Sequence, residues 1–253
     1  MQQSSSKRAH RLQVSRGSPI IAIIETNPAK LSPGLGCLFP PGALVAELRE
    51  PGNPSLLLHE EAQYIGKAVL KRVQEFAAGR LCARALLSEF GVKDFPVTVA
   101  DDRQPVWPEA LVGSITHTQG LCAAVVAERA LLRAVGLDSE VAGSVKAELW
   151  PSICTPAEIE WLRSLAESER TIAATLIFSA KEAFYKCQYP LARERLSFQD
   201  ARVEVFSLGA ARGEFNIHAT RRIALAAHAE LPMRGRYLIH ENYLSTGIAL
   251  ASG

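Results

Sequence analysis

The chain has 253 residues, of which 48% are hydrophobic and 21% charged, and its formal net charge at pH 7 is +2. This composition is typical of a folded protein with one large domain or two lobes, and it excludes a disordered chain. The small net charge argues against a dedicated nucleic-acid-binding protein, and no apolar run approaches the roughly 20 residues that span a bilayer.

The N-terminal segment, residues 1–18, contains serine and arginine, but no acid and no apolar core. We therefore expect a disordered tail and no secretory signal, while an organelle transit peptide remains an alternative. Residues 19–26, PIIAIIET, predict a β-branched strand. A loop rich in proline and glycine follows, and residues 43–48, ALVAEL, predict a second strand.

Residues 59–90 predict the longest helix, because the stretch lacks proline and Gly91 stands where a glycine commonly follows a helix. Gly66 and Gly79 are positions at which this helix could kink. FPVTVA, residues 95–100, predicts one strand within a loop region. Residues 111–128, LVGSITHTQGLCAAVVAE, predict two apolar strands joined by a tight turn at 118–120.

The second half of the chain begins with RAVGLDSEV, residues 133–141, which predicts a strand that runs into a loop. In the following CTPAEIEWLRSLA, Thr155 is the expected N-cap of a helix and Glu158 completes a capping box. We expect Ser168 to cap another helix, which stops before Pro190.

Residues 197–251 predict two or three further strands. Adjacent strands and separate long helices together predict an α+β fold and not a regular βαβ alternation. The five cysteines are scattered without a CxxC pair, which predicts free thiols in a reducing compartment and no zinc site.

The first cluster of candidate functional residues is GLDSE. Side chains alternate along a strand, so Asp138 and Glu140 face one side and Ser139 the other. Two carboxylates at the end of an apolar strand suit a hard cation, Mg²⁺ above all. The plainer interpretation is a solvated strand end.

The second cluster is FSAKEAFYK, residues 178–186. Five side chains fall at i, i+3, i+4, i+7 and i+8 and share a helical face: Phe178, Lys181, Glu182, Tyr185 and Lys186. An exposed i,i+4 ion pair is one interpretation, but it leaves two aromatic rings in water. A covered face would need a metal and phosphates to neutralise its charges.

The third cluster is positive. Guanidinium groups, hydroxyls and an imidazole suit phosphate oxygens, and six candidates are Arg72, Arg80, Arg84, Arg103, Ser114 and His117. The alternative interpretation is that the arginines are helix-surface charges and that the histidine is a structural residue.

Taken together, KRVQEFAAGRLCAR, RQPVWP, GSITHT, VGLDSE and FSAKEAFYK resemble the 4′-phosphopantetheinyl transferase family. The resemblance is to the larger type that activates non-ribosomal peptide, siderophore and polyketide synthases. It implies two similar α/β lobes packed as a pseudo-dimer, here residues 19–133 and 134–253, with coenzyme A in the cleft between them. Ser139 departs from the family pattern, in which an apolar residue or alanine is usual between the two acids.

The resemblance also implies an activity, the transfer of the phosphopantetheine arm from coenzyme A to a serine of an apo acyl or peptidyl carrier protein, with release of 3′,5′-ADP. Asp138, Glu140 and Glu182 would hold Mg²⁺, or Mn²⁺ in its place, and Glu182 would also accept the serine proton. Lys181 and Lys186 would lie near the pyrophosphate. The nucleotide phosphates would be bound by Arg72, Arg80, Arg103, Ser114 and His117.

Two other functions stay open from the residues alone, a Mg²⁺-dependent phosphodiesterase or nuclease and a non-catalytic coenzyme A-binding protein. For the transferase we expect a cytoplasmic monomer that binds neither membrane nor nucleic acid. The carrier would dock on apolar residues beside basic ones, near the loop after Glu140 or near residues 184–189.

Overall fold

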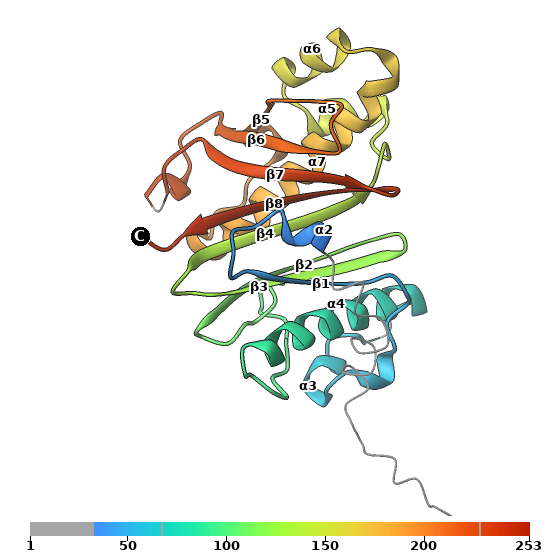
Figure 1. Cartoon of the computed structure of the whole chain (residues 1–253), viewed down its shortest axis with the longest axis vertical. Coiled ribbons are helices and arrows are strands. Elements are labelled where there is room, and N and C mark those ends of the chain that lie inside the picture. The colour runs from blue at the N-terminus through green and yellow to red at the C-terminus, as the bar shows by residue number, and fades with distance from the viewer. Residues whose placement is uncertain (1–32, 67, 228) are drawn as a thin grey trace, which may run out of the picture.

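The computed structural model describes residues 33–66, 68–227 and 229–253. The predicted tail and the strand expected at 19–26 lie outside these residues. Figure 1 shows an elongated molecule with two sheets along its length, each covered by a long helix. None of the helices in the described part is long and apolar enough to cross a membrane.

The first sheet has three antiparallel strands in the order β1-β3-β2. The strands are β1 (Leu44–Leu48), β2 (Leu111–Thr118) and β3 (Leu121–Glu128). The predicted hairpin is confirmed: β2 and β3 pair along their whole length, and Gly120 takes the left-handed φ of +77° that the tight turn requires. The helix α4 (Leu70–Glu89) packs on this sheet, and their apolar side chains form a common core.

The single helix predicted over residues 59–90 is wrong in its first part. The chain forms a short α3 (His59–Ala62) and only then α4, which begins at Leu70. Gly66 takes a left-handed φ of +52° between them, which a continuous helix excludes. The strand predicted at 95–100 does not form beyond one isolated bridge, Val99 to Pro105, and proline at both 96 and 105 removes the N–H groups a ladder needs.

The second sheet has five antiparallel strands in the order β4-β8-β7-β6-β5. Its strands are β4 (Leu132–Val141), β5 (Ala201–Val205), β6 (Arg212–Ala219), β7 (Met233–His240) and β8 (Tyr243–Ala251). The helix α7 (Glu167–Ala192) lies across one face of this sheet and packs on β4 and β8. Two smaller helices, α5 (Trp150–Ile153) and α6 (Pro156–Ser164), lie at the far end (Figure 1).

The start of α6 is as predicted. Thr155 is the N-cap, its Oγ1 accepts from the backbone N–H of Glu158, and Glu158 Oε2 accepts from the N–H of Thr155 at 2.6 Å. The ends of α7 differ from prediction. Its N-cap is Ala166 in place of Ser168, and it continues past Pro190, where the missing N–H removes only one hydrogen bond of the last turn.

The two sheets meet where β2 lies beside β4. The N–H of Leu137 donates to Ser114 Oγ at 3.1 Å, and the N–H of Ser139 donates to Thr116 Oγ1 at 3.1 Å. Side-chain hydroxyls thus take the place of a backbone ladder between the sheets. A further apolar core fills this junction, with side chains from β2, β3 and β4 and from the segment that begins at α2 (Pro33–Gly36).

Short 3₁₀ helices complete the fold: η2 (Pro54–Leu56), η3 (Ala147–Leu149), η4 (Phe198–Asp200) and η5 (Ala224–Ala227). The α+β class predicted from the sequence is confirmed by these helices and two antiparallel sheets. The division into lobes at 133/134 stays a prediction.

Candidate active site

The acidic strand and the charged helix meet because Gly136 lets α7 approach β4 closely. A Cβ atom at this position would lie 1.9 Å from the carbonyl oxygen of Ala183, well inside any allowed contact. The glycine of GLDSE therefore has a packing role. It sets the distance between Asp138 on the strand and Lys186 on the helix.

Asp138 is the centre of the contacts at this junction, and its side chain is buried. Its Oδ1 accepts from Lys186 Nζ at 2.7 Å and from Thr116 Oγ1 at 3.3 Å. Lys186 Nζ also donates to the carbonyl oxygen of Leu137 at 3.1 Å. The second carboxylate oxygen, Oδ2, is buried and has no hydrogen-bond partner.

Glu140 and Glu182 share this electrostatic environment. Burial raises the pKa of Glu140 to about 7, and the negative charges of Asp138 and Glu182 add to the rise while Lys186 opposes it. The pKa of Glu182 is also raised, first by burial and then by Asp138, again against the effect of Lys186. Three carboxylates therefore face a single ammonium group, and another positive charge would stabilise all three.

These residues suit a divalent cation in their chemistry. Carboxylate oxygens are the ligands that Mg²⁺ prefers, and the unpartnered Oδ2 of Asp138 is a buried oxygen of the required kind. Within the described residues, no three histidine, cysteine, aspartate or glutamate side chains converge closely enough to form a complete metal site. The three acids are neighbours, and their metal-binding role stays a prediction.

A cleft of about 970 Å³ opens beside this cluster, with Glu182 and Lys186 on its wall. Tyr185 and Tyr189 of α7 also line it, and their rings stack with centroids 5.3 Å apart. Its remaining walls come from the loop before β2, from β2 itself and from β4. Five arginines line the cleft: Arg103, Arg129, Arg133, Arg193 and Arg195. A basic cleft beside carboxylates and a lysine suits a phosphate ester that also binds a cation.

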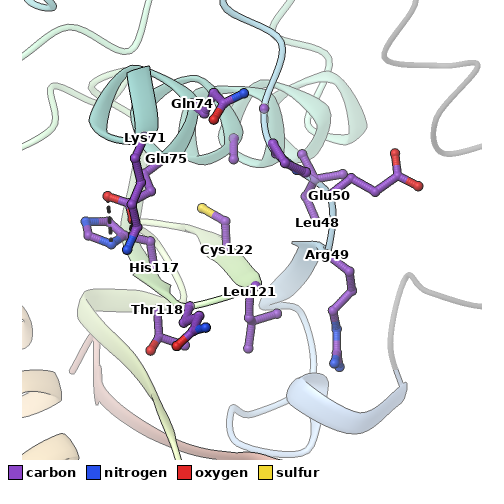
Figure 2. Close-up of a pocket in the computed structure, with 15 residues that line it drawn as sticks. Leu48, Arg49, Glu50, Lys71, Gln74, Glu75, His117, Thr118, Leu121 and Cys122 are labelled. Atoms are coloured by element: carbon purple, nitrogen blue, oxygen red, sulfur yellow. Dashed lines mark ion pairs between the residues drawn. The ribbon is translucent and has the colours of Figure 1, made fainter. Parts of the chain in front are cut away.

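His117 lies in a second, smaller pocket of about 160 Å³ between β2 and α4, shown in Figure 2. Its Nδ1 is 3.9 Å from Glu75 Oε2 of α4, and Lys71 stands beside the pair. Burial lowers the pKa of His117, Arg72 and Lys186 lower it further, and Glu75 and Asp138 oppose the shift. His117 is therefore within electrostatic reach of both the α4 arginine and the acid cluster.

The other predicted phosphate ligands do not lie in one place: two line the large cleft, one is exposed on α4 and one is buried. Arg103 and Ser114 line the large cleft, although Ser114 Oγ already accepts from the N–H of Leu137. Arg72 is exposed on α4. Arg80 is buried, with its guanidinium carbon 3.7 Å from the Phe76 ring centroid, and burial lowers its pKa to about 10.

Two basic residues, Arg84 and Lys181, form buried ion pairs within the fold and do not line the cleft. Arg84 of α4 pairs with buried Glu61 of α3 at 3.0 Å and donates to the carbonyl oxygen of Leu56, so its expected place in a phosphate cluster is wrong.

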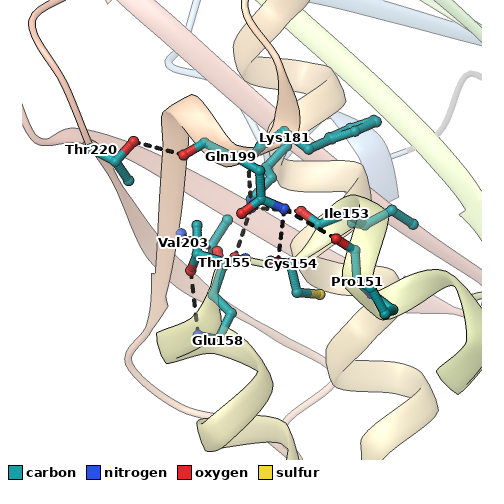
Figure 3. Close-up of polar contacts among 10 residues, drawn as sticks. Pro151, Ile153, Cys154, Thr155, Glu158, Lys181, Gln199, Val203 and Thr220 are labelled. Atoms are coloured by element: carbon teal, nitrogen blue, oxygen red, sulfur yellow. Dashed lines mark hydrogen bonds and ion pairs between the residues drawn. The ribbon is translucent and has the colours of Figure 1, made fainter.

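Lys181 also departs from its predicted place. It is only 3% exposed, and its Nζ donates to Glu158 Oε2 at 2.7 Å and to the carbonyl oxygens of Ile153 and Phe198 (Figure 3). Lys181 and Lys186 stand five residues apart, which is about 140° around the helix, so they lie at the two edges of the face expected from the motif. We correct the expectation that Lys181 lies near a pyrophosphate.

Two contributors to the site were missed in the sequence. Thr116 holds both Asp138 and the backbone of Ser139, and Asp102 pairs with Arg193 across the rim of the cleft. The alternation of Ser114 and Thr116 in GSITHT is a signal for paired hydroxyls on one strand face, but their partner on β4 lies outside the local sequence. The partner of Asp102 is 91 positions away.

Comparison with known proteins assigns a class to this fold and site. Residues 60–127 match the model of the 4′-phosphopantetheinyl transferase N-terminal domain, and residues 134–240 match that of the 4′-phosphopantetheinyl transferase superfamily. The chain therefore belongs to the 4′-phosphopantetheinyl transferase superfamily and is an enzyme of that class.

Curated relatives agree with this assignment. The chain is 31% identical to the 4′-phosphopantetheinyl transferase Npt of Nocardia iowensis, over 85% of this chain and 98% of that protein. It is 34% identical to PptT of Mycobacterium tuberculosis, over 76% of this chain and 86% of the relative. With Svp of Streptomyces mobaraensis the identity is 40%, over 61% of this chain and 64% of the relative.

Proposed function

We propose that this protein transfers the 4′-phosphopantetheine group of coenzyme A to a serine hydroxyl of an apo acyl or peptidyl carrier protein, with Mg²⁺ as the required cation. Membership of the transferase superfamily supports the reaction class. The observation that carries the assignment to these residues is the ion pair of buried Asp138 with Lys186, which lies within electrostatic range of Glu140 and Glu182. Lys186 and Glu182 also stand on the wall of an arginine-lined cleft.

In this proposal the serine oxygen attacks the phosphorus that carries the pantetheine arm. A new O–P bond forms, the pyrophosphate bridge breaks, and 3′,5′-ADP leaves. Glu182, on the cleft wall, accepts the serine proton as a general base. Lys186 stabilises the negative charge that develops on the departing phosphate.

Asp138, Glu140 and Glu182 are the residues that would hold the cation. When bound, Mg²⁺ supplies positive charge to the pyrophosphate oxygens during transfer. Lys186 Nζ is 2.7 Å from Asp138 Oδ1, and a cation held by Asp138 would leave this ammonium group available for phosphate. Arg103 on the cleft wall and His117 in the second, smaller pocket are the proposed contacts for the remaining phosphates of coenzyme A.

The five cysteines all fall within the described residues and are free thiols, which supports a reducing compartment such as the cytoplasm. The expectation of a monomer that binds no nucleic acid stays a prediction, as does the choice among siderophore, polyketide and other carrier proteins.

The test is the intact mass of purified apo-carrier proteins after incubation with coenzyme A, Mg²⁺ and this protein. We expect a mass increase equal to one phosphopantetheine group, and a loss of at least about 100-fold in rate for Asp138→Asn and Glu182→Gln. Glu128→Gln, an exposed change at the end of β3, is the matched control and should keep the wild-type rate.

Three other outcomes would contradict the proposed site or favour another function. Wild-type modification by the Asp138→Asn variant overturns the role given to this acid. Cleavage of coenzyme A or of a nucleic-acid phosphodiester, without any carrier product, points to the phosphodiesterase. Tight coenzyme A binding without turnover on any carrier points to a non-catalytic binding protein.

A further inference from the structure

An ion pair joins the two sides of the large cleft at its rim. Asp102 lies in the loop before β2, and Arg193 follows the last turn of α7. Arg193 Nη1 is 2.5 Å from Asp102 Oδ2, and both residues line the cleft. The pair therefore connects the loop to the helix that carries Glu182 and Lys186.

Asp102 also builds the turn in which it lies. Its Oδ1 accepts from the backbone N–H of Gln104 at 3.2 Å, and its Oδ2 accepts from Gln104 Nε2 at 2.7 Å. The turn is closed by backbone hydrogen bonds from Arg103 N to Ala100 O and from Ala100 N to Gln104 O, both at 2.8 Å. One carboxylate thus fixes the loop internally and anchors it to α7.

The backbone on both sides of this ion pair is in a conformation that favours glycine. Arg103 has φ of +72° and Arg193 has φ of +53°. Residues with a Cβ atom adopt this region at a cost of about 1 kcal/mol or more, so surrounding contacts must hold them there. Backbone hydrogen bonds hold each residue there, from Arg103 N to Ala100 O and from Arg193 N to Tyr189 O. Asp102 adds side-chain contacts, directly to Arg193 and through the turn to Arg103.

We propose that Asp102 is a positioning residue for the anionic co-substrate: it holds the left-handed turn that directs Arg103 into the cleft and fixes that turn to α7. The proposal rests on the proposed function, because the anion meant is the part of coenzyme A whose phosphates Arg103 is proposed to contact. Without Asp102 the turn loses its side-chain hydrogen bonds and its link to α7. The loop then relaxes, and Arg103 no longer has a fixed place.

Charge alone predicts the opposite change in coenzyme A affinity when Asp102 is removed. Asp102 is a negative group at the rim of a cleft that binds an anion, so removing its charge should by itself improve the affinity for coenzyme A. If Asp102 positions Arg103, removing Asp102 should weaken the affinity for coenzyme A. The direction of the change in dissociation constant therefore distinguishes the two roles.

The experiment measures coenzyme A binding by calorimetry, without a carrier protein, and carrier modification separately. For Asp102→Ala we expect a dissociation constant and a KM for coenzyme A about 10-fold higher, with kcat changed less than about 3-fold. Asp102→Asn keeps an acceptor for Gln104 N–H but loses the charged partner of Arg193, so its effect should be smaller. Arg234→Ala, which removes an exposed ion pair between β7 and Glu214 of β6, is the control and should change neither value.

A double-mutant cycle tests whether Asp102 acts through Arg103. If it does, Asp102→Ala should have little further effect on coenzyme A affinity in an Arg103→Ala background. Additive losses, or tighter binding by Asp102→Ala, would overturn the proposal. If the wild type modifies no carrier but the affinities follow this pattern, the proposed function fails and the positioning role stands.

Discussion

At the scale of single residues, His117 combines a nearby carboxylate with a pKa that is lowered and not raised. Its Nδ1 is 3.9 Å from Glu75, a partner that favours the charged ring, yet burial and the charges of Arg72 and Lys186 lower its pKa. In the free protein the ring is therefore uncharged at neutral pH. A phosphate bound in the same pocket would favour the imidazolium form.

We predict that coenzyme A binding takes up a proton at His117 and that the affinity increases as the pH falls from about 7.5 to 6. Calorimetry in buffers of different ionisation enthalpy measures this uptake. His117→Gln should lose most of it, whereas His218→Gln, a change in the exposed β6 pair with Glu204, should keep it. Equal proton uptake by His117→Gln and the wild type would contradict the assignment.

The lowered pKa of His117 also affects folding: acidification, which should favour coenzyme A binding, should destabilise the folded protein. Because the folded-state pKa of His117 is lowered, the unfolded chain takes up this proton first as the pH falls below about 6.5. His117 therefore contributes to a loss of stability on acidification, and binding measurements should stay at a pH where the protein is fully folded.

At the scale of elements, α7 has two charged sides with different roles. Glu182 and Lys186 face the cleft, whereas Lys181 is directed into the contact with α6 and the segment before β5. Glu158 completes this network, since its Oε1 accepts from the N–H of Val203 at 2.7 Å (Figure 3). The buried pair fixes the helix against the rest of its sheet.

We predict that Lys181→Met lowers the free energy of unfolding by about 3–5 kcal/mol, because it leaves the Glu158 carboxylate buried without its cation. Denaturant unfolding measures the loss, and Lys181→Met/Glu158→Gln should recover part of it. The folded fraction of Lys181→Met should keep a kcat within about 3-fold of the wild type. A variant of normal stability with no activity would restore Lys181 to a catalytic role.

At the scale of the whole molecule, the two sheets are joined by hydroxyl groups near Asp138. Thr116 Oγ1 accepts from the N–H of Ser139 and donates to Asp138 at 3.3 Å, and Ser114 Oγ accepts from the N–H of Leu137. Both hydroxyls are buried. The junction between sheets and the acid cluster therefore depend on the same side chains.

We predict that Thr116→Val, which keeps the shape but removes the hydroxyl, costs about 1–3 kcal/mol of stability because the buried N–H of Ser139 loses its acceptor. It should also slow carrier modification, since Asp138 loses a donor. Denaturant unfolding and the mass assay measure the two effects. Thr220→Val, at an exposed hydroxyl bonded to Gln199, should change stability by less than about 0.5 kcal/mol, and a similar value for Thr116→Val would refute the prediction.

The sequence by itself determined the features whose causes are local. The hairpin around Gly120 and the capping box of Thr155 and Glu158 depend on residues a few positions apart, and both are confirmed. The motif order also predicted the family correctly. Gly66 was a predicted kink position, but the sequence did not show that the long helix divides there. At Pro190 the tertiary packing of α7 outweighs the preference for a break.

Only the tertiary structure decided which charges face the cleft. Lys181 and Lys186 stand in one motif, and helical spacing alone placed them together, but one meets Glu158 and the other Asp138. The partner of each lysine comes from a distant part of the chain. Because burying an unpaired charge is costly, each lysine must point toward its acidic partner. For the same reason the Asp102–Arg193 pair could not be predicted, because its two residues become neighbours only when α7 packs on β4.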